Sequence, residues 1–120
     1  MEPNYATQAE TYYTLISEKN VEGIKKYLHS DVILCTPLAT VKGKDTVVQA
    51  VSHFMKAFTK LAIRAKFGTG NQAMIVYDTD ITGIAKGFPG ASLLTFQDGL
   101  IVKIELFYDG TPFNVKSNSN

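Results

Sequence analysis

The side chains able to carry out chemistry are few in this chain and stand far apart in the sequence. The two histidines, His29 and His53, have no cysteine or glutamate at ligand spacing, so we expect no metal site. The single cysteine, Cys35, has no histidine expected on its side of the chain, which argues against a nucleophile. The glycines follow no phosphate-loop or dinucleotide-binding pattern. No cofactor is therefore predicted.

The carboxylates can be sorted by the face of a strand on which they lie, because successive side chains of a strand point to opposite faces. A strand over residues 100–109 places Glu105 on the face opposite to Tyr108. We expect Glu105 to face outward and to pair with a basic neighbour. Asp31 and Asp109 stand at strand edges, where a structural role is expected. Asp109 is nevertheless the carboxylate that a pocket mouth near the strand end would reach, so it is the candidate catalytic base.

Helical periodicity in the first half of the chain supplies the elements that position these groups. From residue 5 to about 19, apolar side chains recur at the spacing that stacks them on one face of a helix. Tyr12 falls near the middle of this face and Tyr13 towards its edge. Asn20 is the expected N-cap of a second, short helix. His29 then stands in the last turn of that helix, where a cation suits the helix dipole.

A short strand and a third helix follow. The strand spans residues 32–36 and ends at Thr36, because Pro37 cannot continue a ladder of hydrogen bonds. A turn then places Asp45 in the first turn of a helix that runs to about residue 58, the end that favours an anion. The buried stripe of this helix is Val47, Val51, Phe54 and Phe58.

The second half of the chain reads as strands, over residues 61–67, 73–81, 91–96 and 100–109. Alternation within the second of these turns Tyr77 and Thr79 inward and Asp78 and Asp80 outward. The glycine-rich segment before residue 91 is expected to be a loop or a bulge. Helices followed by a strand meander predict an α+β fold, with the helices on one face of a mainly antiparallel sheet.

Composition limits the class of protein. The 120 residues are expected to form one domain, residues 1–120, with a frayed polar tail over residues 115–120. The formal charge is +1 and no basic run is present, so no nucleic-acid partner is expected. No stretch has the roughly 18 uninterrupted apolar residues of a membrane span, so no membrane partner is expected either. With no signal peptide recognised and one cysteine, the cytoplasm is the expected location.

Three segments carry a resemblance to a known family. They are Glu22-Gly23-Ile24 leading to Asp31-Val32, the segment Phe96-Gln97-Asp98-Gly99-Leu100-Ile101, and Phe107-Tyr108-Asp109. With the order of elements, they resemble the NTF2-like superfamily, most closely its SnoaL-like and ketosteroid-isomerase-like branches. The resemblance implies a cone-shaped α+β barrel, with three N-terminal helices packed on a curved sheet around an apolar pocket. It leaves the activity open, since the superfamily holds isomerases, dehydratases, cyclases, epoxide hydrolases and binding or scaffold proteins.

The ketosteroid-isomerase mechanism uses an aspartate base and an oxyanion hole formed by a tyrosine and a protonated aspartate. By the resemblance, Tyr12 matches the oxyanion-hole tyrosine, Thr36 stands at the position of the base, and Ser92 stands near that of the partner aspartate. A threonine hydroxyl cannot take a proton from carbon near neutral pH. We therefore predict that this isomerase mechanism fails here.

The expected pocket is apolar with a few hydroxyl groups, which suits a small hydrophobic or aromatic ligand. Tyr12, Thr36 and Ser92 are the predicted polar groups that fix the ligand. The other expected pocket residues are Ile16, Leu34, Phe54, Phe58, Tyr77, Leu94 and Tyr108. Two alternatives remain open. One is a SnoaL-like enzyme that uses Tyr12 as electrophile and Asp109 as base, and the other is a structural or dimerisation module with a filled core.

The outer face of the sheet is predicted to form a homodimer. Its outward positions by alternation are Met74, Val76, Leu93, Ile101 and Phe107, with Asp78, Lys103 and Glu105 among them. This mixture is too apolar for a solvated face and too polar for a core, as expected of an interface. The family resemblance implies the same pairing of sheet to sheet.

Overall fold

The computed structural model describes residues 4–112, which form three helices and one sheet. The helices are α1 (Tyr5–Ser17), α2 (Val21–Lys25) and α3 (Lys44–Ala57). The strands are β1 (Leu28–Cys35), β2 (Thr40–Lys42), β3 (Phe58–Thr69), β4 (Gln72–Ile81), β5 (Ala85–Gln97) and β6 (Leu100–Phe107). The α+β class expected from the sequence is confirmed. The tail expected at residues 115–120 lies outside the described residues.

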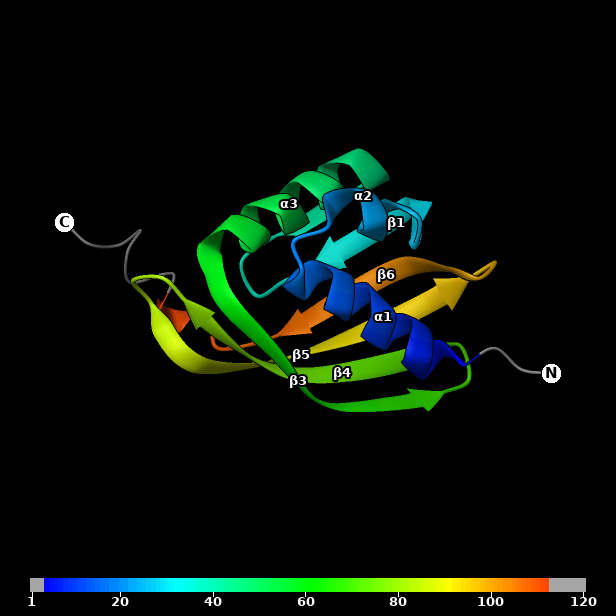
Figure 1. The fold of residues 1–120 in the computed structure, drawn as a ribbon. Helices are drawn as coiled ribbons and strands as arrows, with labels where there is room; N and C mark the ends of the chain where they lie inside the picture. The colour runs from blue at the N-terminus through cyan, green and yellow to red at the C-terminus, as the bar shows by residue number, and fades with distance from the viewer. Residues whose placement is uncertain (1–3, 113–120) are drawn as a thin grey trace.

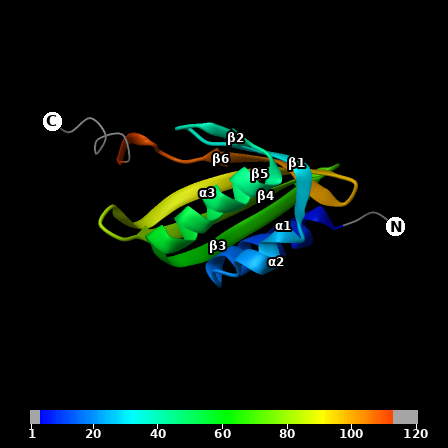
Figure 2. The ribbon, with the colours of Figure 1, turned by 90° about the horizontal axis from the view of Figure 1, so that it is seen from above.

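The six strands form one sheet in the order β2-β1-β6-β5-β4-β3. Neighbouring strands are antiparallel except β1 and β6, which run parallel. Figure 1 shows the three helices on one side of a curved sheet. In the view from above, α3 lies beside α1 and α2 (Figure 2). The face of the sheet towards the helices is called the inner face below, and the opposite face the outer face.

Local signals explain where the helices begin. The side chain of Asn4 accepts a hydrogen bond from the Thr7 amide at 3.0 Å and caps α1. Asn20 is the N-cap of α2, as expected, and accepts from the Gly23 amide at 2.8 Å. Asp45 stands in the first turn of α3. The starts of α2 and α3 are therefore set by nearby residues that the sequence makes visible.

The expected end of the second helix is wrong. His29 lies in β1 rather than in a last helical turn, because α2 ends at Lys25. Leu28 pairs with Ile101 of β6 and is buried, and the Tyr27 carbonyl accepts the Ile101 amide at 2.8 Å. Pairing with a distant strand has overridden the helical periodicity of this segment.

The outward position of Ile101 is also wrong, since its side chain is fully buried. Ile101 pairs with Phe96, whereas Lys103 pairs with Thr95, so Val102 is an extra residue in β6. Such a bulge shifts the alternation by one residue and turns Ile101 to the inner face.

A second bulge at Arg64 of β3 changes which side chains line the outer face. Ile63 pairs with Tyr77, but Ala65 pairs with Val76, so the alternation expected for residues 61–67 breaks at Arg64. Phe67 then pairs with Met74 on the outer face and is 61% exposed. Lys66 turns to the inner face, where it pairs with Glu10 of α1 at 2.7 Å.

Candidate functional site

A cavity of about 390 Å³ lies between the helices and the inner face of the sheet. Its lining residues, called the wall below, come from α1, α3 and four strands and the segments next to them. They are Tyr12, Tyr13, Ile16, Leu34, Thr36, Ala50, Val51, Phe54, Ala57, Tyr77, Thr79, Ile81, Ile84, Phe88, Pro89, Gly90, Ile104, Leu106 and Tyr108. An apolar pocket between helices and sheet, as the family resemblance implied, is present.

The wall is buried at one end and partly exposed at the other. Tyr12, Tyr13, Tyr77 and Ile104 are buried and mark the inner end. The larger partly exposed wall residues include Thr36, Phe54, Ile84, Phe88 and Tyr108, and these mark the mouth. The mouth is therefore lined by aromatic and aliphatic side chains together with Thr36, and the inner end by tyrosines and Ile104.

Three tyrosines are packed together at the inner end. Tyr13 of α1 stacks on Tyr77 of β4, with ring centroids 5.2 Å apart and planes inclined by 26°. Tyr12 meets Tyr13 edge-on, with centroids 5.5 Å apart. The Tyr77 ring also lies against Gly90, where an added Cβ would stand 3.0 Å from a ring carbon. Gly90 thus gives Tyr77 the room to lie against β5.

Burial keeps these phenols protonated. It is the main cause that raises the pKa of Tyr12 and of Tyr13 well above the ordinary value, with a further rise from Tyr77. Burial also raises the pKa of Tyr77 to about 12, against a lowering by the hydrogen bond with Tyr13. All three hydroxyls are neutral hydrogen-bond donors at neutral pH.

The hydroxyl of Tyr12 is buried and has no hydrogen-bond partner among residues 4–112. A buried phenol normally finds a partner, and leaving a buried polar group unpaired costs about 1–3 kcal/mol. The sequence predicted that Tyr12 points inward and lies at the pocket, and the structure places it in the wall. Among the described residues, Tyr12 and Ser92 carry buried side-chain hydroxyls without a hydrogen-bond partner, and of these two residues only Tyr12 belongs to the wall.

The other two predicted polar groups are arranged differently. Thr36 belongs to the wall, but its hydroxyl accepts from the amides of Leu38 and Ala39 and donates to the Ala39 carbonyl. Ser92 is fully buried outside the wall, and its hydroxyl has no hydrogen bond of good geometry in the described residues. It lies close enough to Tyr13 to offset part of the rise in the pKa of that phenol.

The apolar residues predicted for the pocket are divided between the wall and the core. Ile16, Leu34, Phe54, Tyr77 and Tyr108 belong to the wall. Phe58 and Leu94 are buried in the core outside it.

The candidate bases lie away from the cavity. Asp109 is exposed and outside the wall, and a hydrogen bond from the Thr111 amide at 2.9 Å lowers the pKa of its carboxyl. Glu105 faces Lys103 at 3.9 Å, the basic neighbour that was expected. His29 lies beside Asp31 on β1. Within the wall as described, no carboxylate, imidazole, thiol or amine is present.

The sequence did not single out Tyr13 and Phe88 as pocket residues. Tyr13 is next to Tyr12 and reaches the wall because the cavity touches a wider arc of α1 than its central stripe. Phe88 stood in the segment read as a loop or bulge, and it lies in β5. Its place in the wall follows from the register of β5, which shows in the sequence only as glycines at residues 83 and 87.

Two general features of the described residues bear on the class of site. Among residues 4–112, no three His, Cys, Asp or Glu side chains gather as they would to hold a metal ion. None of the helices in this part of the chain has the length and apolarity to cross a membrane.

Comparison with known proteins places the fold. The family model of the SnoaL-like domain matches residues 9–104. Three solved structures illustrate the likeness. A protein from Kribbella flavida is 21% identical, with a TM-score of 0.86 over 95% of this chain and 93% of that one. A steroid delta-isomerase from Pseudomonas aeruginosa is 19% identical, with a TM-score of 0.78 over 99% of this chain and 95% of the other.

The third is an NTF2-like protein of unknown function from Cytophaga hutchinsonii, 20% identical, with a TM-score of 0.74 over 86% and 88% of the two chains. No curated protein matches the sequence. At these identities the structural likeness shows the fold alone, and the family rests on the match to the family model.

Proposed function

The chain belongs to the SnoaL-like domain family, and we propose that it binds a small, largely apolar or aromatic molecule that carries one neutral oxygen. The observation that carries the proposal is the apolar cavity whose wall includes Tyr12, a residue with a buried and unpartnered hydroxyl. A ligand carbonyl or hydroxyl that reaches the inner end would accept the hydrogen bond that Tyr12 cannot donate within the described residues. The rest of the ligand would replace water against aromatic and aliphatic side chains.

The size of the cavity supports a ligand of more than one ring. An engineered apolar protein cavity of about 150 Å³ binds benzene. The cavity here, about 390 Å³, is between two and three times as large. A two-ring aromatic ketone is therefore a suitable probe. A volume of this size argues against the module with a filled core, whose wall side chains would have to meet one another.

The charge of the wall supports a neutral ligand. No described side chain of the wall is basic, so a carboxylate or phosphate would be buried without a counter-ion. Burying an unpaired charge is far more costly than burying a neutral oxygen. The phenols donate but stay uncharged at neutral pH, which suits a carbonyl acceptor.

The described groups favour binding over proton-transfer catalysis. The steroid delta-isomerase among the similar structures is an enzyme by its printed name, and Tyr12 would suit the electrophile of such a reaction. A reaction of this type also needs a base in reach of the substrate. Asp109, the predicted candidate, lies outside the wall, and its lowered pKa makes it a weaker base.

A ligand panel tests the proposal. Native mass spectrometry of the purified protein is followed by titration with naphthalene, acetylnaphthalene and naphthoate. We expect acetylnaphthalene to bind most tightly, naphthalene more weakly and naphthoate least. If none binds, or if naphthoate binds best, the proposed function is wrong.

We also propose that the outer face pairs with a second copy of the chain. Its apolar members now include Phe67 together with Met74, Val76, Leu93 and Phe107, and the last of these is 50% exposed. Charged groups beside them are paired within the chain, Arg64 with Asp78 and Lys103 with Glu105. Apolar side chains flanked by charges that are paired in this way can meet a copy of themselves around a twofold axis.

A further inference from the structure

A third bulge, in β5, determines which way Phe88 points. Thr79 pairs with Phe88 and Ile81 pairs with Ala85, so Asp80 stands opposite both Lys86 and Gly87. If β5 had no extra residue, the register at Ile81 and Ala85 would place Phe88 opposite Asp78, on the outer face. The extra residue instead turns Phe88 to the inner face and into the wall of the cavity.

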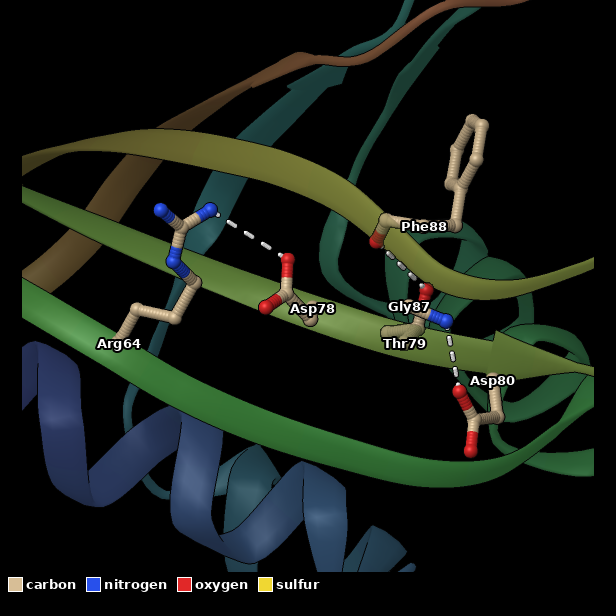
Figure 3. A network of polar contacts seen from close by, with 6 residues as sticks. All are labelled: Arg64, Asp78, Thr79, Asp80, Gly87 and Phe88. Carbon is tan, nitrogen blue, oxygen red and sulfur yellow. Dashed lines mark hydrogen bonds and ion pairs between the residues drawn. The ribbon is translucent and has the colours of Figure 1, made fainter.

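Side chains of β4 hold this bulge from both sides. The Asp80 carboxylate accepts the Gly87 amide at 2.7 Å, and the Thr79 hydroxyl donates to the Phe88 carbonyl at 3.4 Å (Figure 3). Gly87 has φ +60°, in the left-handed region that favours glycine, and an added Cβ would meet nothing within 4 Å. Gly87 is therefore required for its backbone conformation and not for space.

The ring of Phe88 meets Tyr108 at the mouth of the cavity. The two ring centroids are 6.2 Å apart and the planes are inclined by 64°. Both residues are partly exposed and belong to the wall. We call the pair Phe88 and Tyr108 the aromatic corner. A planar aromatic ligand that lies there can stack its face on one ring and point its edge at the other. These are the two arrangements that aromatic rings prefer.

We propose that Phe88 is a specificity-determining residue that selects aromatic over saturated ligands, and that Asp80 is the positioning residue that directs Phe88 to the mouth. This inference rests on the proposed function, and it concerns the opposite end of the cavity from Tyr12. It gives a role to the carboxylate of Asp80, which lies outside the wall and accepts a hydrogen bond from the Gly87 amide.

Two ligands of similar shape and different ring chemistry, acetylnaphthalene and its saturated analogue acetyldecalin, test the inference. For Phe88→Leu we expect the affinity for acetylnaphthalene to fall about threefold to tenfold, the usual worth of an aromatic pair, while that for acetyldecalin stays within about twofold. Asp80→Ala should show the same selective loss. Asp80→Asn keeps an oxygen that accepts the Gly87 amide and should bind both ligands as the wild type does.

A double-mutant cycle shows whether Asp80 acts through Phe88. If it does, the double variant of Asp80→Ala and Phe88→Leu loses no more affinity for acetylnaphthalene than Phe88→Leu alone. The matched control is Asp78→Ala, which removes the other outward-facing carboxylate of β4. Asp78 pairs with Arg64 at 3.4 Å, and Figure 3 shows this pair beside the bulge. This control should leave the ratio of the two affinities unchanged.

The outcomes separate the two proposals. If the wild type binds acetylnaphthalene but Phe88→Leu weakens both ligands equally or neither, the inference is overturned and the proposed function stands. Additive losses in the double variant overturn the role of Asp80. If the wild type binds neither ketone, the proposed function fails and the inference fails with it. Thermal unfolding of each variant shows that a selective loss does not come from partial unfolding.

Discussion

Replacing Tyr12 by phenylalanine should make the protein more stable and a worse receptor for a ketone. The change deletes one hydroxyl oxygen and keeps the ring that packs against Tyr13 and Tyr27. In the described part of the chain that oxygen is buried without a partner, so its loss removes a desolvation cost of about 1–3 kcal/mol. The gap left by one oxygen, roughly 20 Å³, costs about 0.5 kcal/mol at about 24 cal/mol per Å³.

The free energy of unfolding of the ligand-free protein should therefore rise by about 0.5–2.5 kcal/mol. For a domain of 120 residues, 1 kcal/mol corresponds to a shift in Tm of about 3–6 °C, so a rise of several degrees is expected. Affinity should move in the opposite direction. The hydrogen bond that Tyr12 donates to a ketone is worth about 0.5–1.5 kcal/mol, which raises the Kd roughly 2-fold to 13-fold.

The assay compares acetylnaphthalene with naphthalene, which has no oxygen. Because the chain has no tryptophan, the fluorescence of the naphthyl group can be followed without tryptophan emission from the protein. Tyr12→Phe should lower the affinity for acetylnaphthalene and leave the affinity for naphthalene unchanged. Tyr27→Phe is the matched control, because Tyr27 lies near Tyr12 but is not in the wall, and it should change neither affinity.

The reasoning is refuted if Tyr12→Phe binds acetylnaphthalene as tightly as the wild type does, since Tyr12 would then be a core residue alone. A fall in Tm of several degrees in Tyr12→Phe would refute the prediction that removing the hydroxyl stabilises the ligand-free protein. It would mean that the hydroxyl has a partner in solution and that no acceptor is needed from a ligand.

Three further predictions follow from the same packing. Stability should fall as the pH rises from about 10, where unfolded tyrosines ionise while Tyr12, Tyr13 and Tyr77 stay protonated in the fold, and the loss from Tyr77 should be complete near pH 12. Urea unfolding at several pH values in this range gives the free energy of unfolding as a function of pH. Tyr77→Phe should make its fall with pH less steep by up to about 1.4 kcal/mol per pH unit. An unchanged pH dependence would contradict the raised pKa of Tyr77. Gly90→Ala should cost about 1–3 kcal/mol, because the new methyl group crowds the Tyr77 ring, and an unchanged urea midpoint would count against this close contact. Sedimentation at micromolar concentration should show a dimer that Phe107→Glu weakens, since a carboxylate would be buried unpaired, and a monomeric wild type would exclude this interface.

Much of the fold could be predicted because its signals are local. The stripe of α1 that contains Tyr12 and Ile16 and the Asn20 cap of α2 are each visible within a few residues of sequence. Alternation placed Tyr77 inward and Glu105 outward, and both placements are confirmed. These features depend on helix and strand periods, which neighbouring residues fix.

The candidate site was predictable to the extent that it follows the same periods. Tyr12, Ile16, Leu34 and Phe54 reach the wall from helices and strands, and Tyr108 reaches it from the position directly after β6. Which hydroxyl is left without a partner was not predictable. It depends on the turn that occupies the hydroxyl of Thr36 and on the packing that hides Ser92, and both arise from contacts that composition and spacing do not encode.

Three bulges mark what only the tertiary structure decided. An extra residue at Val102 turned Ile101 into the core, one at Arg64 turned Phe67 to the outer face, and one at Gly87 turned Phe88 into the cavity. In each case the pairing of two neighbouring strands of the sheet determined where the alternation shifts. The sequence by itself determined the family, the presence of three helices and the inward positions of Tyr12 and Tyr77. The shape of the mouth and the composition of the outer face were decided by strand register, because one inserted residue reverses every side chain that follows it.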